Sequence, residues 1–237
     1  MGQLFAELAR DETPDGTITL RRRWEPAREV DVYEVKLGDE WLMSSLFTVG
    51  EVELARIGLA AVDGDQDLDV VVGGLGLGYT AGAALDDDRV RSLLVVDAVS
   101  AVIGWHADGL LPEVGDLGAD ERTRMVHGDF FALATGTDGF DPDRPGRRVD
   151  AILVDIDHTP RHHLAPGNAA FYTVDGLRAL RRHLSDGGVF ALWSDDPPDD
   201  DFMAVLGEAF DHADAHVVAF RNFYTGGESS NTVYVGR

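Results

Sequence analysis

Two stretches of this chain combine residue types that could bind a nucleoside. Residues 69–81 read Asp-Val-Val-Val-Gly-Gly-Leu-Gly-Leu-Gly-Tyr-Thr-Ala, a short apolar strand that runs into glycines. Glycines let the main chain approach a ligand closely, so we expect the four glycines of this loop to contact one: Gly73, Gly74, Gly76 and Gly78. A second apolar strand ends in Asp97, with Ala98 next, and both are expected at the cofactor; the carboxylate of Asp97 could accept hydrogen bonds from both hydroxyls of a ribose.

The glycine spacing fits two ligand classes. Gly74-x-Gly76-x-Gly78 is typical of a loop that binds S-adenosylmethionine, whereas Gly76-x-Gly78-x-x-Ala81 also satisfies the dinucleotide fingerprint. The first glycine follows the strand directly and Tyr79 stands in the dinucleotide register, and both features favour the adenosyl ligand. A purely structural turn is the third interpretation.

Two residues after the next predicted strand could bind the base of that nucleoside. Asp129 and Phe130 follow the strand at residues 124–127. In such a sheet the acid could accept from an adenine amine and the ring could pack on the base. The alternatives are a loop acid with a core phenylalanine, and for Asp97 a helix cap.

Acidic residues also stand at and just after the end of the predicted strand at residues 150–155. Asp155, Asp157 and His158 stand where the strands of an open α/β sheet form a ligand crevice. Two acids and an imidazole could hold an ammonium and accept its proton, and an amine must lose a proton before it attacks an electrophilic carbon. We therefore predict Asp157 and His158 as catalytic residues, with a solvated acidic turn as the alternative.

Two further features concern the same crevice. Asp195 follows the strand at residues 189–193 and is expected to face the crevice. His158, His162 and His163 lie in one loop with Asp157, but their spacing fits no metal-ligand pattern, so no metal site is predicted.

Composition limits the class of protein. The chain has 237 residues, 44% of them hydrophobic, and no cysteine, which excludes disulfides and thiolate chemistry. The net charge of −23 opposes nucleic-acid binding and leaves two interpretations, general solubility or an acidic pocket for a cationic small molecule. No apolar run reaches membrane-spanning length and no export signal is apparent, so a cytoplasmic location without membrane attachment is expected.

The elements that position these residues follow from hydrophobic patterning. Residues 1–47 are predicted as a small N-terminal β element, because residues 17–21, 31–37 and 41–43 alternate apolar and polar side chains. Residues 48–237 are predicted as one α/β domain that begins with a helix capped by Thr48. Its expected strands cover residues 68–72, 92–97, 124–127, 150–155 and 189–193, with helices over residues 79–85, 98–110, 170–183 and 202–213.

The end of the chain distinguishes between sheet types. Predicted strands at residues 216–220 and 232–235 are joined by only 11 residues, too few for a helical crossover, so they must run antiparallel. A parallel α/β sheet that ends in an antiparallel hairpin is typical of Rossmann-like class I S-adenosylmethionine-dependent transferases.

From about Tyr33 onward the chain resembles the spermidine synthase family of polyamine aminopropyltransferases. The resemblance rests on Val71–Gly78, Val95–Asp97, Gly128–Phe131, Asp150–Asp155, Ala170–Tyr172 and Leu184–Gly188. It implies a decarboxylated S-adenosylmethionine donor, a diamine acceptor such as putrescine, and a homodimer. By position, Gly74 and Gly78 would lie under the donor, Asp97 would hold the ribose, Asp129 would hold the adenine and Asp155 would line the crevice, while Tyr172 would lie near the acceptor.

Three positions depart from the family pattern. Gly76 stands where the family has an acid that holds the donor's amine, and His158 stands where it has a second aspartate. The family's acidic Tyr-x-Glu segment survives only as Glu51. We therefore expect a transferase that uses S-adenosylmethionine or its decarboxylated form on a changed amine or small-metabolite acceptor, bound by Glu51, Tyr172 and Asp195. The alternatives are a small-molecule methyltransferase and a non-catalytic binding protein of the same fold.

Overall fold

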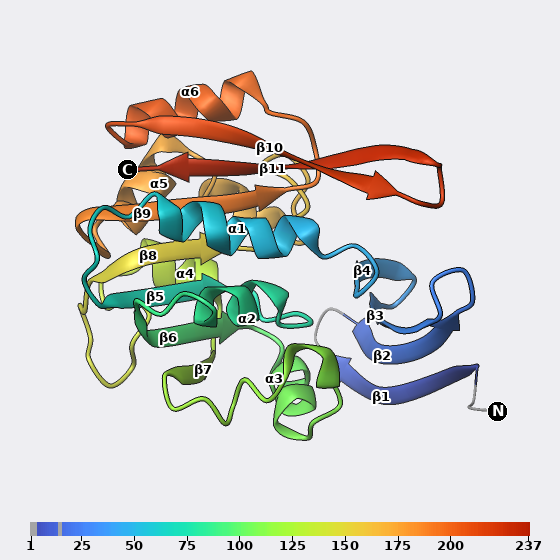
Figure 1. The fold of residues 1–237 in the computed structure, drawn as a ribbon. Coiled ribbons are helices and arrows are strands. Elements are labelled where there is room, and N and C mark those ends of the chain that lie inside the picture. The colour runs from blue at the N-terminus through green and yellow to red at the C-terminus, as the bar shows by residue number, and fades with distance from the viewer. Residues whose placement is uncertain (1–3, 14–15) are drawn as a thin grey trace.

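The computed structural model describes residues 4–13 and 16–237, which form two sheets (Figure 1). The N-terminal sheet is antiparallel and has the order β1-β2-β3-β4. Its strands are β1 (Phe5–Thr13), β2 (Gly16–Glu25), β3 (Val30–Leu37) and β4 (Glu40–Ser44). Residues 1–3 and 14–15 of the expected N-terminal β element lie outside the described residues.

The small sheet buries one row of alternating side chains. Ile18 and Leu20 of β2 and Val35 of β3 are at most 1% exposed and belong to the main hydrophobic core. Strand β1 was not expected, and its pattern explains why. A bulge between Glu7 and Ala9 shifts its register against β2, so the two-residue alternation that marks a strand is broken there.

The large sheet has seven strands in the order β10-β11-β9-β8-β5-β6-β7. Strands β5 to β9 pair in parallel, whereas β11 pairs antiparallel with both β9 and β10. The Rossmann-like sheet and its antiparallel C-terminal hairpin are thus confirmed. The strands are β5 (Leu68–Gly73), β6 (Val90–Asp97), β7 (Thr123–His127), β8 (Val149–Val154), β9 (Leu184–Ser194), β10 (Ala213–Asn222) and β11 (Gly227–Gly236).

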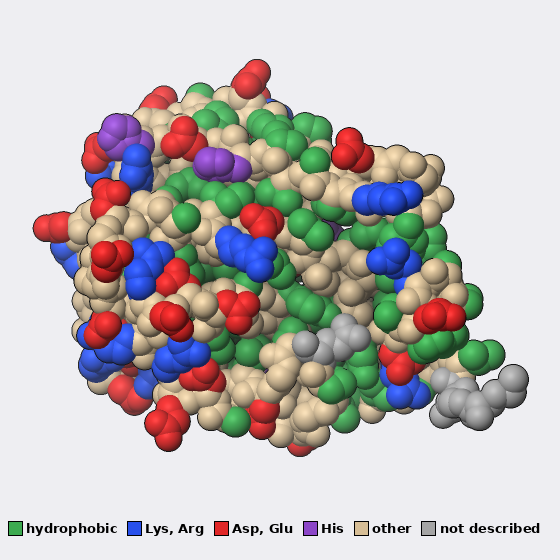
Figure 2. Space-filling view, in the orientation of Figure 1, with side chains coloured by type: hydrophobic (Ala, Val, Ile, Leu, Met, Phe, Trp, Pro, Cys, Tyr) green, Lys and Arg blue, Asp and Glu red, His purple; other side chains and the backbone are tan. Residues whose placement is uncertain are grey.

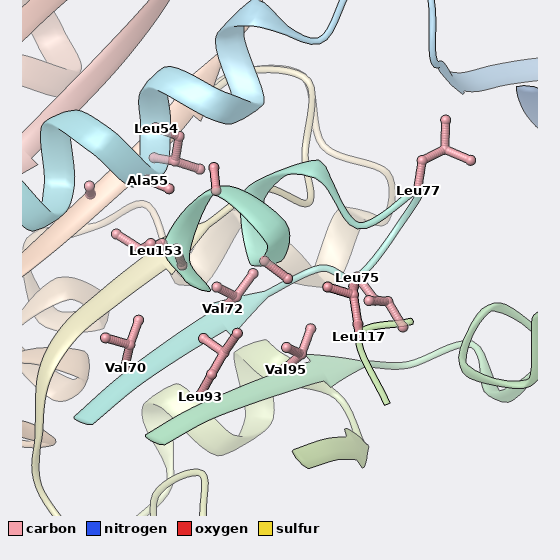
Figure 3. Close-up of a cluster of buried hydrophobic side chains, with 14 of the residues drawn as sticks. Leu54, Ala55, Val70, Val72, Leu75, Leu77, Leu93, Val95, Leu117 and Leu153 are labelled. Carbon is pink, nitrogen blue, oxygen red and sulfur yellow. The ribbon is translucent and has the colours of Figure 1, made fainter. Parts of the chain in front are cut away.

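Helices cover both faces of the large sheet, with α1 and α2 in front and α4 and α5 behind in Figure 1. The helices are α1 (Val49–Ala60), α2 (Tyr79–Leu85), α3 (Ser100–Ala107), α4 (Phe130–Thr135), α5 (Val174–Arg181) and α6 (Asp200–Ala209). Successive residues of β5 enter opposite layers: Val70 and Val72 pack with the α1 side, and Val71 packs with the α5 side. Figure 3 shows Leu54 and Ala55 of α1 above Val72 and Leu153. Both faces of β5 are therefore dry, which explains its continuous apolar run.

Strand β5 is the point at which the chain changes direction across the sheet. It pairs with β6 on one side and with β8 on the other, and Gly73 is in register with both Val96 and Val154. In open α/β sheets the ligand crevice lies outside the carboxyl ends of the strands at such a switch point. The fold therefore brings the residues that follow Gly73, Val96 and Val154 together.

Some helices differ from expectation. The segment expected as one helix over residues 170–183 is a 3-10 helix at Pro166–Ala170 followed by α5, which Thr173 caps through the Gly176 N–H. Helix α3 covers Ser100–Ala107 only, because glycine follows at 109. Thr48 precedes α1 without a side-chain capping bond. No described helix is long and apolar enough to cross a membrane.

Candidate functional site

A cavity of about 350 Å³ lies at the switch point, between the large sheet and strand β4. Figure 2 shows hydrophobic side chains gathered along the junction of the two sheets. The cavity is lined by Trp41, Leu42, Met43, Ser44, Phe47, Glu51, Gly74, Leu75, Gly76, Leu77, Gly78, Tyr79, Asp155, Ile156, His158, Trp193 and Asp195. Of the residues predicted from the sequence, the structure places Gly74, Gly76, Gly78, Glu51, Asp155, His158 and Asp195 in this lining.

The glycine loop forms one wall and needs glycine for conformation and space. Gly74, Gly76 and Gly78 have φ values of +91°, +47° and +91°, a region that glycine adopts without strain. A Cβ atom on Gly74 would collide with the main-chain carbonyl of Asp155, which cannot move aside. The Gly74 N–H donates to the Val96 carbonyl at 2.9 Å, which joins the loop to β6.

Strand β4 packs a side chain against the glycine loop beside Gly76. A Cβ atom on Gly76 would lie 2.7 Å from Sδ of Met43. Met43 therefore fills the space beside Gly76, and the small sheet forms part of the cavity wall next to the glycine loop.

Two half-buried carboxylates face the cavity from different elements. Glu51 comes from the first turn of α1, and Asp155 directly follows β8. Burial, together with the charges of Asp155 and Asp195, raises the pKa of Glu51 well above its usual range. Burial likewise raises the pKa of Asp155, although a 2.7 Å hydrogen bond from the Thr80 hydroxyl opposes this shift. The described lining contains no lysine or arginine that could neutralise these groups.

Asp195 and several aromatic rings complete the lining. The Asn231 side-chain amide donates to Asp195 at 2.9 Å and so connects it to β11. Trp41, Phe47 and Trp193 contribute rings, and the indole Nε1 of Trp193 is buried without a hydrogen-bond partner in the described part of the chain. Aromatic faces and carboxylates together form a site that attracts cations.

His158 lines the cavity beside the small sheet. Its Nε2 lies 3.5 Å from a carboxylate oxygen of Glu40 in β4, and its carbonyl accepts from the Asp195 N–H at 2.8 Å. The loop that carries His158 thus connects the ends of β8 and β9 with the N-terminal sheet.

Asp157 and Tyr172, both predicted as functional, do not line the cavity. Asp157 is 1% exposed, and its carboxylate accepts from the Leu164 N–H at 2.6 Å, the Asn168 amide at 2.9 Å and the Tyr172 hydroxyl at 2.9 Å. Burial and the adjacent Asp157 charge hold the pKa of Tyr172 far above its ordinary value. The pair anchors the loop over residues 158–170.

Asp97 binds the protein's own main chain. Its oxygens accept from Leu75 N–H at 2.9 Å, from Val99 N–H at 2.7 Å and from Gly76 N–H, while burial raises its pKa. Asp97 therefore shapes the glycine loop in this structure. A carboxylate has about four lone-pair sites, so Asp97 could still accept a hydrogen bond from a ribose hydroxyl beside its main-chain donors. That ribose contact stays a prediction.

Four other predicted ligand contacts lie outside the cavity lining. Phe130 is 2% exposed and packs beneath Gly73, where a Cβ atom would lie 2.5 Å from its ring. Asp129 caps α4 by accepting from the Phe131 and Ala132 N–H groups. Ala98 uses its carbonyl to accept from Nε2 of His127 at 3.1 Å.

The lining includes residues that sequence reasoning missed, among them Trp41, Met43, Phe47 and Trp193. Thr80, which donates to Asp155 from outside the lining, was missed as well. Each lies within a predicted strand or helix or beside one, and the local pattern carries no sign that its side chain meets a ligand. Among the described residues, no group of three or more His, Asp or Glu side chains could hold a metal ion.

The two sheets together define the class of protein. A seven-stranded sheet with an antiparallel end, preceded by a small antiparallel sheet, is a class I methyltransferase-type Rossmann-like fold with an N-terminal extension. The sequence matches no protein-family model and no curated protein.

Solved structures supply the particular comparison. Spermidine synthase from Thermotoga maritima superposes with a TM-score of 0.71 at 15% identity, covering 97% of this chain and 72% of that one. A spermidine synthase in complex with the transition state analogue AdoDATO gives 0.69 at 15% identity, covering 97% and 71%. A probable spermidine synthase from Corynebacterium glutamicum gives 0.65 at 17% identity, covering 96% and 79%. The chain thus has the fold of spermidine synthases, as the sequence resemblance predicted.

Proposed function

We propose that this protein is a transferase that binds a cationic adenosyl sulfonium donor, S-adenosylmethionine or its decarboxylated form, and transfers a carbon group to an amine or small-metabolite acceptor. The observation that carries the proposal is the pair of half-buried carboxylates, Glu51 and Asp155, beside the glycine loop. Two partly desolvated acids without a cation in the described lining destabilise each other. A sulfonium or ammonium group placed between them would relieve that repulsion.

Each part of the cavity has a proposed task in this chemistry. The main chain of Gly74 and Gly78 supports the nucleoside, and the rings of Trp41 and Phe47 pack around the cationic part of the substrates. Asp155 and Asp195 orient the acceptor nitrogen. Holding the acceptor nitrogen in line with the C–S bond of the donor supplies most of the rate enhancement, because the attack becomes effectively unimolecular.

The proton of the acceptor amine needs a receiver within the cavity. Attack by the nitrogen lone pair forms the new C–N bond, the C–S bond breaks, and its electron pair stays on the sulfur as a neutral thioether. We propose Glu51 as the receiver: the bound cation ionises it, and its raised pKa returns when the sulfonium becomes a neutral thioether, which favours uptake of the proton. His158 is the second candidate since it also lines the cavity, and Asp157 is engaged elsewhere.

A methyltransferase is the second candidate function, favoured by Gly76. The acid that would hold a donor amine is replaced by glycine, and Met43 occupies the space beside it. An intact S-adenosylmethionine donor carries a carboxylate that an acid at this position would repel. The changed loop therefore accommodates the intact donor as well as the decarboxylated one.

Calorimetric titration with S-adenosylmethionine, decarboxylated S-adenosylmethionine and methylthioadenosine tests the proposal. Preference for the decarboxylated donor supports aminopropyl transfer, and preference for the intact donor supports methyl transfer. Incubation with a diamine or polyamine mixture, followed by mass spectrometry, then identifies the added group. Binding without turnover would support the non-catalytic alternative, and failure to bind all three compounds would reject the proposal.

A further inference from the structure

His106 lies beneath the glycine loop, and the proposed chemistry does not use it. The residue is 4% exposed and comes from the last turn of α3. Its Nε2 is 2.9 Å from the Gly76 carbonyl oxygen. Because a carbonyl oxygen can only accept, Nε2 must carry the hydrogen in this contact.

The surroundings of the ring favour a neutral imidazole in this one tautomer. Nδ1 is buried and has no hydrogen-bond partner in the described part of the chain. Burial lowers the pKa of His106, while the Gly76 bond and the nearby Asp97 charge oppose that shift. A Cβ atom on Gly78 would lie 2.8 Å from both the His106 ring and Leu117, so the ring has little room to turn.

Asp97 holds the same peptide segment from the other side. It accepts hydrogen bonds from the N–H groups of Leu75 and Gly76, whereas His106 donates to the Gly76 carbonyl. Gly76 has a φ of +47°, and a glycine backbone has little conformational preference of its own. The conformation of the loop at Gly76 therefore depends on these two side chains.

We propose that His106 is a positioning residue that fixes the ligand-binding conformation of the glycine loop through the Gly76 carbonyl. This role rests on the proposed function, because the loop borders the cavity assigned to the adenosyl donor. His106 does not itself line that cavity. It acts by ordering the loop before the ligand arrives, so that less ordering free energy is lost on binding.

Two substitutions of similar size separate the hydrogen bond from the packing. His106→Gln keeps an N–H donor near the position of Nε2, and His106→Met fills the space without a donor. Titration with methylthioadenosine should show binding weakened about tenfold in the Met variant and within about threefold of wild type in the Gln variant, as expected for the loss and retention of one hydrogen bond. Melting temperatures of both variants report any general loss of stability.

The tautomer of His106 gives a readout that does not depend on a variant. Nitrogen-15 NMR of the wild-type protein should show a neutral ring protonated at Nε2. A ring protonated at Nδ1, or equal ligand affinity in the Met and Gln variants, overturns the positioning role while the proposed function stands. Failure of the wild type to bind methylthioadenosine and both donor forms overturns the proposed function, and the role of His106 with it.

Discussion

Asp155 and Asp157 are two positions apart, yet they meet different surroundings. Asp155 faces the cavity. The carboxylate of Asp157 instead accepts from the Leu164 N–H, the Asn168 amide and the Tyr172 hydroxyl. The sequence places both acids after an apolar strand, and that much could be predicted. Strand β8 ends at Val154, so the alternation of a strand no longer dictates where the following side chains point. For this reason the sequence pattern alone could not show whether the Asp157 side chain faces the cavity, as the catalytic assignment requires.

The raised pKa of Glu51 predicts proton release when a cation binds. A bound cation favours the ionised carboxylate, so the pKa falls in the complex and a proton leaves. Apparent affinity for the decarboxylated donor should therefore rise with pH above about pH 5, by up to about tenfold per pH unit, until Glu51 is ionised in the free protein. Calorimetry in buffers of different ionisation enthalpy measures the released proton directly.

The matched variants are Glu51→Gln and Asp157→Asn. The Gln variant should lose the proton release and should be more stable than wild type at pH 8, because a group with a raised folded-state pKa destabilises the fold as pH rises. The Asn variant should keep the proton release. It should lose about 1.5–3 kcal/mol of stability, because charge-assisted hydrogen bonds are broken. Undiminished proton release in the Gln variant would remove Glu51 from this role.

At the scale of elements, the strands of the large sheet were easier to predict than the short helices. Helix α4 has six residues, too few for the helical period to emerge, and its capping acid Asp129 reads equally well as a ligand contact. Because the helix is so short, the sequence pattern also did not indicate that Phe130 is a core residue. Its ring covers Gly73 in the core, and only the three-dimensional packing shows on which side of the sheet it lies.

Gly74, in the loop between β5 and α2, and Gly82, within α2, provide a matched pair of glycines for substitution. Gly74→Ala should cost about 1–3 kcal/mol for the left-handed backbone, with the collision against the Asp155 carbonyl added to it. Gly82→Ala in α2 meets nothing within 4 Å and should stabilise the protein by about 0.5–1 kcal/mol. Urea denaturation measures both. A tolerated Gly74→Ala would contradict the close approach of the loop to β8.

At the scale of the whole molecule, the C-terminal hairpin joins the two sheets. It extends from the large sheet toward the small one in Figure 1. At its tip the Tyr224 hydroxyl donates to Glu25 at 2.6 Å and accepts from Arg23 at 3.2 Å. Bonds from Tyr224, Arg23 and the Ala27 N–H lower the pKa of Glu25 to about 2. Phe47, which lines the cavity, stacks on Phe223 at 5.0 Å.

Tyr224→Phe should loosen this junction without removing the ring. We expect amide hydrogen exchange over residues 25–30 and 222–227 to accelerate about fivefold, because the two hydrogen bonds of the Tyr224 hydroxyl are lost. Exchange in β5 and β8 serves as the internal control and should not change. Uniform acceleration across the chain would instead indicate global destabilisation.

The homodimer expected from the family resemblance stays a prediction, which sedimentation velocity would test.

The position of Met43 limits which side chains the loop can carry at position 76. Aspartate tolerates a left-handed backbone better than most residues, so the main chain at position 76 is no strong barrier to an acid there. The thioether is the barrier, because it already fills that volume. An aspartate introduced at position 76 would thus have to displace the Met43 side chain, and a smaller residue at position 43 should ease that substitution. The two positions form an epistatic pair that spans both sheets.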